Sequence, residues 1–440
     1  MQQRKVMTWS LIAGLGGFLF GFETTVVSGA EQAIQQYWDL NAWAHGFTVA
    51  VSLIGALCGA LAGRVTADAW GRKKTLKVAA LLFLLVSIGA ALTQHWPLFL
   101  FFRFLAGAGA GISVTTGNVY ISEIVPDRSR ARLASLFQLT VVAGLVAAYF
   151  SNYLIAFHYG HSGAWRWMLG IQAAPALLYL GLLRGIPESP RWLFVHFKRP
   201  GDAREVLKQI HPRRYEEALS AIRDNSLREQ AANRPSQLLT PKYRWAVFLS
   251  VLLAAFSQVT GIHAILCYAP RIFQMAGLEK SNALLSSVGL GLAYLLFSML
   301  AVRVLRQVNQ RKLLLAGSIG LLLALVLVSQ SFSKGGSAGV LMACLVLFVA
   351  CFATGQDLVS RVFCTEAFPE YLQAGGQAVV FFTHALLAAV VIILFPPLYV
   401  AFGPGSTFLI FASTLVVQLL FVWRFMPDSG KRLRAVEGKG

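Results

Sequence analysis

Residues 68–94 read DAWGRKKTLKVAALLFLLVSIGAALTQ, a short charged turn followed by a long apolar run. A helix rises ~1.5 Å per residue and the hydrocarbon core of a bilayer is ~30 Å thick, so about 20 apolar residues cross it. Residues 76–94 fit that length and hold a single charged residue, Lys77, next to the turn. The stretch therefore predicts a transmembrane helix that follows a basic cytoplasmic turn.

Apolar runs of this kind recur along the whole chain. Hydropathy predicts twelve helices, at 8–30, 46–66, 76–94, 98–122, 134–157, 166–184, 244–267, 283–304, 313–332, 338–364, 376–397 and 405–425. The chain is 56% hydrophobic and only 13% charged, a composition that would make a water-soluble domain aggregate. We expect an all-α membrane protein with twelve transmembrane helices in two pseudo-symmetric six-helix bundles.

The positions of the basic residues explain the net charge of +19. With both termini inside, 32 of the 38 Lys and Arg residues fall in cytoplasmic segments and two lie within helices. The four outside are Arg166, Arg271, Lys280 and Lys334. This asymmetry is the positive-inside pattern of membrane proteins. It predicts a multi-pass protein of the plasma membrane, the inner membrane in a bacterium, with cytoplasmic termini and no nucleic-acid partner.

No motif indicates an enzyme, a metal or a cofactor. The five cysteines fall in apolar helices and lack metal-ligand spacing. The glycines of residues 106–111, AGAGAG, are explained by close packing of membrane helices. The chain shows no P-loop, metal cluster or nucleophile elbow. The first apolar run is too long for a signal peptide, so we expect it to be retained as the first helix.

Hydrophobicity falls and charge rises between residues 187 and 243, which divides the chain in two. We assign 1–186 to an N-terminal six-helix bundle, 187–243 to a cytoplasmic linker with short amphipathic helices, 244–426 to a C-terminal six-helix bundle, and 427–440 to a cytoplasmic tail. Internal repeats support two halves: 68–73 reappears as 307–312, 123–130 as 366–373, and 187–189 as 427–429. Duplicated halves place a substrate site between two bundles near the middle of the membrane.

Three motifs resemble signatures of the sugar porter family of the major facilitator superfamily: 68–74 (DAWGRKK), 123–130 (EIVPDRSR) and 187–192 (PESPRW). The third motif is specific to the family, whereas the first indicates only the superfamily. The resemblance is closest to bacterial proton-coupled members. It covers essentially the whole chain, strongly in the first half and patchily in the second. It implies a secondary transporter that works by alternating access.

By this resemblance, charged residues at the cytoplasmic helix ends form ion pairs that hold the inner side together while the transporter faces outward. The residues are Asp68, Arg72, Glu123, Arg130, Glu188, Arg191 and, in the second half, Glu366. The alternative is that they are only loop charges of the positive-inside pattern. Gln307, Gln310 and Gln373 replace the family's Asp, Gly and Arg, so we expect a weaker inner contact in the second half and a bias toward inward-facing states.

Four ionisable residues lie well inside the predicted spans, where a charge costs roughly 3 kcal/mol on insertion scales. By resemblance, Glu23 on the first helix and Arg103 on the fourth match the acid and the arginine of proton-coupled members. Burial favours the neutral form of a carboxyl and a nearby Arg favours the ionised form, so helix movement can load and unload a proton. The alternative is a static ion pair. Gln172 stands where the closest members have a third acidic residue.

Asp357 and Arg361 are the other two ionisable residues within spans. They are four positions apart, which places them on one helix face where they can neutralise each other. By resemblance, Arg361 replaces a tryptophan that packs against the sugar, and Asp357 replaces a helix-breaking glycine. A bidentate cation in the cavity would favour a carboxylate or phosphate substrate, unless Asp357 pairs with it.

Sugar recognition needs groups that both donate and accept hydrogen bonds, aimed at hydroxyls in an otherwise apolar cavity. The resemblance implies Gln138 and Gln258 as sugar ligands, with His263 in place of an Asn and His384 in place of a Gln. Other family ligands are lost, because Leu145 and Ser257 replace Gln, Leu292 replaces Asn, and Ala385 replaces Trp. The alternative for each histidine is a packing role.

We therefore expect a monomeric symporter in the lipid bilayer that couples protons to a sugar or sugar-like polyhydroxy compound, without metal or cofactor. Two alternatives stay open. Arg361 suggests a proton symporter of a sugar acid or other hydroxylated organic acid. A membrane sugar sensor that binds without transport is the alternative from another class, although the tail after Pro427 is short for a signalling extension.

Overall fold

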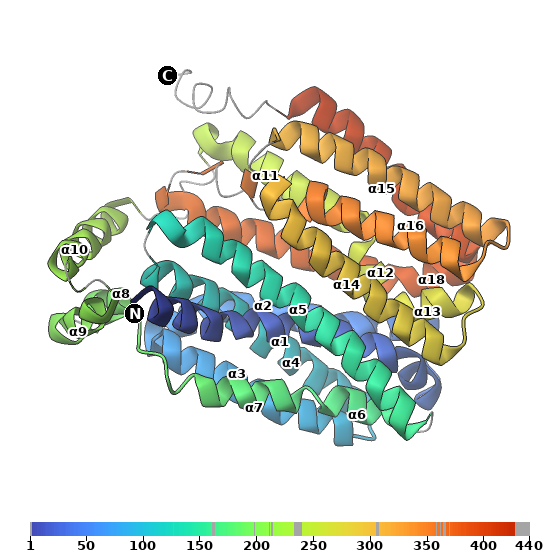
Figure 1. The fold of residues 1–440 in the computed structure, drawn as a ribbon, viewed down its shortest axis with the longest axis horizontal. Coiled ribbons are helices and arrows are strands. Elements are labelled where there is room, and N and C mark those ends of the chain that lie inside the picture. The colour runs from blue at the N-terminus through green and yellow to red at the C-terminus, as the bar shows by residue number, and fades with distance from the viewer. Residues whose placement is uncertain are drawn as a thin grey trace. The chain divides into compact units, whose positions relative to one another are not determined.

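The computed structural model is helical in every element of the part of the chain that it describes (Figure 1). In lipid a helix is favoured because it satisfies each backbone N–H and C=O within one segment. The described residues are 2–125, 127–160, 163–197, 199–210, 212, 214–232, 240–304, 308–357, 359–360, 362–363, 367–368 and 370–426.

The first five long helices are continuous. They are α1 (Gln2–Tyr37), α2 (Ala42–Trp70), α3 (Arg72–Leu92), α4 (Trp96–Ile124) and α5 (Asp127–Tyr159). Each overlaps an expected span and extends past it at one or both ends, because the helix continues into polar sequence that hydropathy does not detect. A single residue, Gly71, separates α2 from α3. Its φ of 92° lies in the left-handed region that glycine adopts without strain.

The sixth expected span is broken into α6 (Ala164–Gly170) and α7 (Ala173–Leu182). Pro175 explains the break, because proline cannot donate to the carbonyl four residues earlier and its ring clashes with that carbonyl. Gln172 therefore lies at the start of α7 rather than in the middle of a helix, and it is only 2% exposed.

Three shorter helices follow: α8 (Pro190–Val195), α9 (Pro200–Ile210) and α10 (Tyr215–Ala232). Ser189 caps α8, since its hydroxyl oxygen accepts from the Trp192 N–H. One face of α9 is buried at helical spacing, through Ala203, Val206, Leu207 and Ile210. Figure 1 shows these helices at the end of the long helices where the chain begins.

The seventh expected span, 244–267, consists of α11 (Pro241–Val259) and α12 (Ile262–Cys267), and α13 (Ala269–Met275) continues beyond it. Gly261, with φ 85°, separates the first two, and a Cβ there would lie 2.6 Å from the Phe411 ring. Tyr268 separates α12 from α13, and Pro270 follows near the start of α13. The segment after residue 268 is thus a separate short helix.

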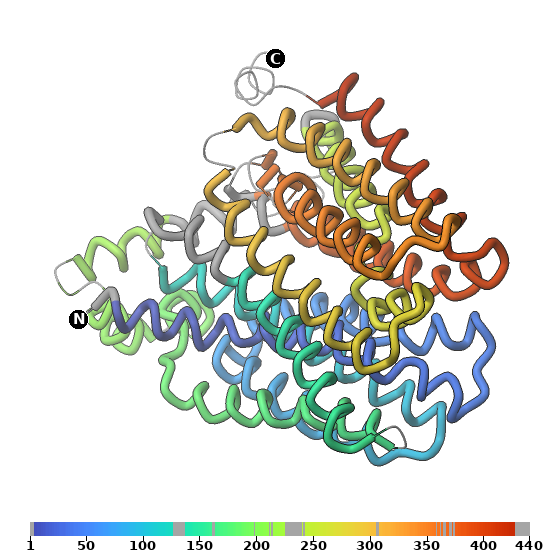
Figure 2. Tube along the Cα trace, turned by 45° about the vertical axis from the view of Figure 1, so that its right-hand side comes forward, coloured from blue at the N-terminus to red at the C-terminus, as the bar shows by residue number. Residues whose placement is uncertain are grey.

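The remaining elements are α14 (Lys280–Val304), α15 (Gln310–Ser333), α16 (Ala338–Cys351), the π-helical turn η2 (Phe352–Asp357) and α18 (Glu370–Phe425). α18 contains the last two expected spans. The backbone of Gly403 is non-helical inside it, at φ 79°. Phe395 before this point contacts the rings of Phe408 and Phe411 after it, so the two arms of α18 pack against each other. Figure 2 shows the course of the backbone through this helix, from orange to red.

Within the described residues, ten helices are long and apolar enough to cross a membrane. This count differs from the expected twelve for two reasons. The sixth span is split into two pieces that are each short, and the eleventh and twelfth are joined into one element.

By its contacts the chain divides into two compact units. The first comprises Met1–Ala30, Val51–Ser151 and Tyr159–Asn233; the second comprises Glu31–Ala50, Asn152–His158 and Arg234–Gly440. In the first unit α2 and α4 meet backbone to backbone, since a Cβ on Gly107 would lie 1.8 Å from the Ser52 carbonyl oxygen. This close approach brings Arg103, one turn earlier on α4, beside α2. The expected domain boundaries stay a prediction.

Candidate functional site

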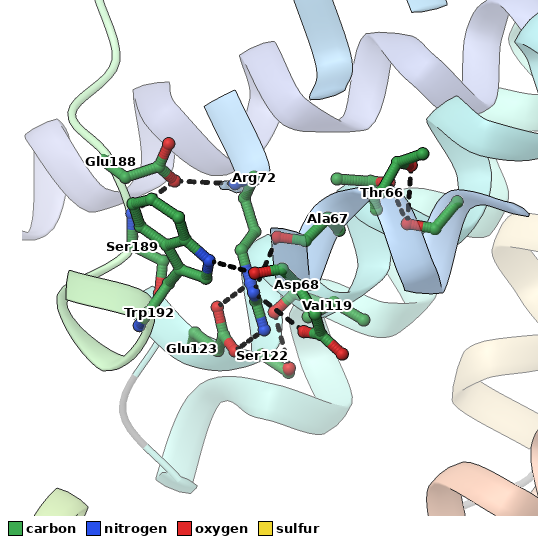
Figure 3. A network of polar contacts seen from close by, with 12 residues as sticks. Thr66, Ala67, Asp68, Arg72, Val119, Ser122, Glu123, Glu188, Ser189 and Trp192 are labelled. Carbon is green, nitrogen blue, oxygen red and sulfur yellow. Dashed lines mark hydrogen bonds and ion pairs between the residues drawn. The ribbon is translucent and has the colours of Figure 1, made fainter. Parts of the chain in front are cut away.

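Arg72, the first residue of α3, is the centre of a polar network at the basic turn (Figure 3). Its guanidinium forms a bidentate pair with Glu123 on α4, from Nε to Oε2 at 2.9 Å and from Nη2 to Oε1 at 2.8 Å. Nη1 lies 3.0 Å from Asp68 Oδ1. The side chains of Arg72 and Glu123 are 6% and 4% exposed, whereas that of Asp68 is 45% exposed. The buried ion pair is therefore the one with Glu123.

Glu188 joins this network through backbone groups. Its Oε1 accepts from the Arg72 N–H at 2.9 Å and from the Ser189 N–H at 2.9 Å, and both oxygens accept from the Lys73 N–H at 3.1 Å. The carboxylate thus caps the N-terminus of α3, where N–H groups lack partners and the helix dipole favours an anion. Burial raises the pKa of the Glu188 carboxyl, although these backbone donors oppose the shift. We call Asp68, Arg72, Glu123 and Glu188 the inner network.

The motif at 187–192 packs on the same turn. Trp192 on α8 donates from Nε1 to the Asp68 carbonyl oxygen at 2.8 Å, and Tyr120 on α4 donates to the Pro187 carbonyl oxygen at 3.0 Å. Arg191 is partly buried on α8. Glu366 and the side chain of Arg130 lie outside the described residues.

The corresponding turn of the second half uses different partners. Asn309 caps α15, because its Oδ1 accepts from the Arg311 N–H at 2.9 Å. The Arg311 guanidinium donates from Nη2 to the backbone carbonyl of Trp423. This described contact is with a neutral acceptor, where Arg72 in the first half contacts a carboxylate.

Glu23 on α1 and Arg103 on α4 form an ion pair inside the first unit. Arg103 donates from Nη1 to Glu23 Oε1, and from Nη2 to Ser52 Oγ on α2 at 3.1 Å. Glu23 is 2% exposed and Arg103 is 1% exposed. The amide of Gln172 lies beside the same carboxyl, yet Glu23 Oε2 and Gln172 Oε1 accept no hydrogen bond of good geometry from the described residues. A buried carboxyl, a buried guanidinium and a buried amide thus lie next to one another.

Gln258, His263 and His384 lie together in the second unit. Gln258 Nε2 donates to Ser257 Oγ and to His384 Nδ1, both at 2.9 Å. The two imidazoles meet edge to face, with centroids 5.4 Å apart. Gln258 is fully buried, and its Oε1 accepts no hydrogen bond from a described residue. This carbonyl oxygen can accept a hydrogen bond from a hydroxyl group of a ligand. Gln138 lies partly buried on α5, in the first unit.

Asp357 ends the π-helical turn and is 8% exposed. Such turns are frequent at functional sites because they widen a helix locally. Gln356 in the same turn donates from Nε2 to Ser318 Oγ at 3.3 Å. Arg361 lies outside the described residues, so its expected pairing with Asp357 stays a prediction.

The structure also brings together three residues that the sequence did not single out as a site: Glu31 on α1, His45 on α2 and Arg271 on α13. Glu31 lies one residue past the expected end of the first helix, and Arg271 is one of the four basic residues expected outside. These two positions were the only indications of this site that the sequence contains. Within the described residues, no group of three His, Cys, Asp or Glu side chains is arranged to hold a metal ion.

Comparison with known proteins gives a family and close relatives. The family model described as "Sugar (and other) transporter" matches residues 9–434. The arabinose-proton symporter of Bacillus subtilis (strain 168) is 33% identical over 442 residues, covering 98% of this chain and 94% of that protein. The D-xylose-proton symporter of Escherichia coli (strain K12) is 28% identical over 469 residues, covering 98% of this chain and 95% of that protein.

Solved structures match over the same length. The inward open conformation of the xylose transporter XylE from E. coli matches with a TM-score of 0.85 and 27% identity, covering 98% of this chain and 99% of that chain. The structure of the proton:xylose symporter XylE bound to 6-bromo-6-deoxy-D-glucose matches with a TM-score of 0.82 and 27% identity, covering 99% of each chain.

Proposed function

The chain belongs to the sugar transporter family of the major facilitator superfamily, and from that membership we propose that it carries a sugar or sugar-like polyhydroxy compound together with protons by alternating access. The membership confirms the expected family and the all-helical major facilitator fold. It also confirms a multi-pass membrane transporter of sugars rather than an enzyme. The coupling to protons and the identity of the cargo are what we propose beyond the family membership.

The observation that carries proton coupling is the place shared by Glu23, Arg103 and Gln172. When Glu23 is ionised, Arg103 neutralises it and the Gln172 amide can donate an N–H to it. When Glu23 is protonated, its O–H can donate to the amide oxygen, because an amide side chain both donates and accepts. The site can therefore hold the carboxyl in either state. The relatives described as proton symporters of arabinose and xylose support the same reading.

The sugar ligands that we propose are Gln138, Gln258, His263 and His384. Gln258 supports this role best, since its N–H groups are used by Ser257 and His384 while its oxygen is left to accept from a substrate hydroxyl. Because the amide nitrogen of Gln258 can only donate, His384 Nδ1 is the acceptor of their hydrogen bond, and a neutral His384 ring then carries its proton on Nε2. Asp357 and Arg361 are proposed as further cavity residues that select between neutral and acidic cargo.

We also propose that the inner network holds the cytoplasmic helix ends together in the outward-facing state, with Arg130, Arg191 and Glu366 contributing. The bidentate contact of Arg72 with Glu123 supports this role, because it joins the ends of two transmembrane helices. The proposed topology has both termini in the cytoplasm, two six-helix bundles at 1–186 and 244–426 joined by 187–243, and a monomer as the working unit.

Uptake by the purified protein in liposomes tests the function. A panel of neutral sugars and sugar acids is offered with and without an inward proton gradient. We expect one neutral sugar to accumulate above its external concentration only when the gradient is present, and the accumulation to collapse when a protonophore is added.

Each other outcome points elsewhere. If only sugar acids accumulate, the cargo is a sugar acid and not a neutral sugar. Equilibration without accumulation would remove proton coupling, and specific binding without flux would favour a sensor.

A further inference from the structure

Five polar side chains converge at one place in the second unit. They are Glu31 and Gln35 on α1, His45 on α2, Arg271 on α13 and Tyr399 on the first arm of α18. We call them the outer network, because the proposed topology places these helix ends outside the cell.

Glu31 and Arg271 form the centre of this network. Glu31 Oε1 accepts from Arg271 Nε at 2.9 Å, and Oε2 accepts from Nη2 at 2.7 Å, which is a bidentate pair. His45 Nε2 lies 2.7 Å from Glu31 Oε2. The side chains of Glu31 and His45 are 0% exposed and that of Arg271 is 12% exposed. Two ionisable side chains are thus completely buried near the end of a membrane helix.

The rest of the network orients the guanidinium. Arg271 Nη2 also donates to Gln35 Oε1 at 2.7 Å, and Nη1 donates to the hydroxyl of Tyr399. The His45 ring packs against Tyr268, with centroids 5.8 Å apart. Residues of α1, α2, α13 and α18 therefore meet through one arginine and one glutamate.

A buried ion pair of this kind suits a reversible contact. Removing two charges from water costs several kcal/mol per ion, and their attraction in the interior roughly offsets this cost. The paired and the separated, hydrated states are then close in free energy. Water can reach the Arg271 side of the pair, because Arg271 lines a cavity of about 380 Å³ together with Gln32, Gln36 and Gln274.

The segments that carry the pair are connected so that they can separate. By contacts, α1 passes from the first unit to the second between Ala30 and Glu31. Arg271 lies on the seven-residue helix α13, which is bounded by non-helical residues Tyr268 and Ala276. Glu31, His45 and Arg271 all belong to the second unit, so their contacts change when α13 moves within that unit, and the non-helical residues at both ends of α13 permit such a motion.

We propose that Glu31, His45 and Arg271 form an outer gate, whose ion pair is made when the transporter is closed to the outside and is broken when it opens to admit cargo. The inference rests on the proposed alternating access, and it assigns to the outer side the same kind of contact that the inner network provides on the cytoplasmic side. Glu31 and Arg271 are the gating pair, and His45 is a positioning residue for the Glu31 carboxylate.

Labelling of a cysteine beneath the gate tests this proposal. Ser28 lies three residues before Glu31 on the same face of α1, is 2% exposed, and its hydroxyl has no partner among the described residues. Ser28→Cys is therefore a mild change. The probe is a membrane-impermeant maleimide added from outside, and labelling of the native cysteines is subtracted with protein that keeps Ser28.

In the Ser28→Cys background, we expect Glu31→Gln to raise the labelling rate about tenfold, as removal of ~1.4 kcal/mol from the closed state requires. Arg271→Gln should have a similar effect, and the double variant should add little, because either change breaks the same pair. Asp39→Asn and Lys280→Gln are the matched controls, each removing one charge outside the network, and should leave the rate unchanged.

Arg271→Lys keeps the charge but loses the bidentate fork, so it should give an intermediate rate even if the neutral variants do not fold. Equal labelling of wild-type and Arg271→Lys protein, both folded by thermal melting, would overturn the gate. The labelling needs neither a known sugar nor a proton gradient. Faster labelling without proton-coupled uptake would thus sustain the gate and count against the proposed function, and unchanged labelling in an active symporter would do the reverse.

Discussion

Glu23 is the residue on which we propose that coupling depends, because its carboxyl is the only acid in the described contacts of Arg103. Glu23→Gln keeps an oxygen that can accept from Arg103 but cannot take up or release a proton at neutral pH. We expect this variant to lose accumulation against a gradient while exchange of labelled for unlabelled sugar continues. The measurement is uptake and exchange in the same liposomes.

Ser52→Ala serves as the matched control for Glu23→Gln. It removes the 3.1 Å contact to Arg103 Nη2 but leaves the titrating carboxyl in place. Coupling should survive in Ser52→Ala. If Glu23→Gln accumulates sugar as well as Ser52→Ala does, Glu23 has no part in coupling.

Gln258 is the residue for which the proposed substrate contact can be tested most directly. Gln258→Ala should weaken sugar binding by about 1–3 kcal/mol, since a buried hydroxyl of the sugar is left without its acceptor and His384 loses a donor. Gln138→Ala should act similarly from the first unit. Binding is measured per folded protein by isothermal titration calorimetry.

Gln418→Ala is the control for the Gln258 prediction. Gln418 is another buried glutamine of the second unit, and it donates to Ser318 Oγ at 3.1 Å, a contact made by none of the proposed ligands. A loss of affinity as large in Gln418→Ala as in Gln258→Ala would mean that both residues serve packing only.

At the residue scale, the sequence shows well which ionisable residues lie inside the membrane spans. It shows poorly which residues they contact in the folded chain. Glu23 and Arg103 stand out because ionisable residues are rare in apolar runs. Glu31 does not stand out in this way, because the hydropathy pattern predicts that the first helix ends at residue 30, whereas the helix continues to Tyr37. The contact between Gln258 and His384 joins positions 126 residues apart, which only the folded chain brings together.

At the scale of elements, the N-terminus of α3 depends on Glu188. Because burial raises the pKa of its carboxyl, the folded protein holds a proton there at higher pH than the unfolded chain, whose value is about 4.5. Stability from this group is therefore fully present below pH 4.5 and is lost as the pH rises through the raised value. Glu188→Gln should remove that dependence.

The measurement for Glu188 is the apparent melting temperature in detergent across pH 4 to 8. The melting temperature of the wild type minus that of Glu188→Gln should fall as the pH rises. Glu205→Gln, which changes an exposed acid of α9, is the control and should show no such trend. A difference for Glu188→Gln that rises with pH would contradict the direction of the shift.

At the scale of elements, the positions and lengths of the apolar helices could be predicted from the sequence. The breaks within these helices could not. Apolar runs locate the long helices because lipid leaves the backbone little choice. The breaks at residues 171–172, Gly261 and Tyr268 depend on one proline or glycine within an otherwise continuous run, and hydropathy averages over them. The π-helical turn before Asp357 has no sequence signal at all, although it shapes a proposed cavity residue.

At the scale of the whole molecule, the two sets of ion pairs bias the transport cycle in opposite directions. In a two-state carrier the populations follow the free-energy difference between the states. The proposed outer gate stabilises the state closed to the outside, and on the inner side Gln307, Gln310 and Gln373 stand where the family has Asp, Gly and Arg. We expect the substrate-free protein to rest facing inward. Cysteine crosslinking that showed a stable outward-facing resting state would contradict this expectation.

We propose that Arg361 decides between neutral and acidic cargo, since it is expected on the same helix face as the buried Asp357. If Arg361 binds a carboxylate, Arg361→Trp should abolish acid transport and bring weak binding of a neutral sugar, as in a family member with tryptophan there. If it only neutralises Asp357, the single change leaves an unpaired acid that destabilises the protein by several kcal/mol unless it protonates. Asp357→Gly combined with Arg361→Trp would then be tolerated better than either single change.

A double-mutant cycle on binding and on folding separates these two roles of Arg361. Strong coupling between the two positions with unaltered cargo selectivity assigns Arg361 to its salt bridge and leaves the sugar neutral. Weak coupling with selective loss of acidic substrates assigns it to the cargo. The second result would also explain why the family's tryptophan, which packs against a neutral ring, is replaced by a cation in this chain, since a carboxylate in an apolar cavity requires a fixed positive charge.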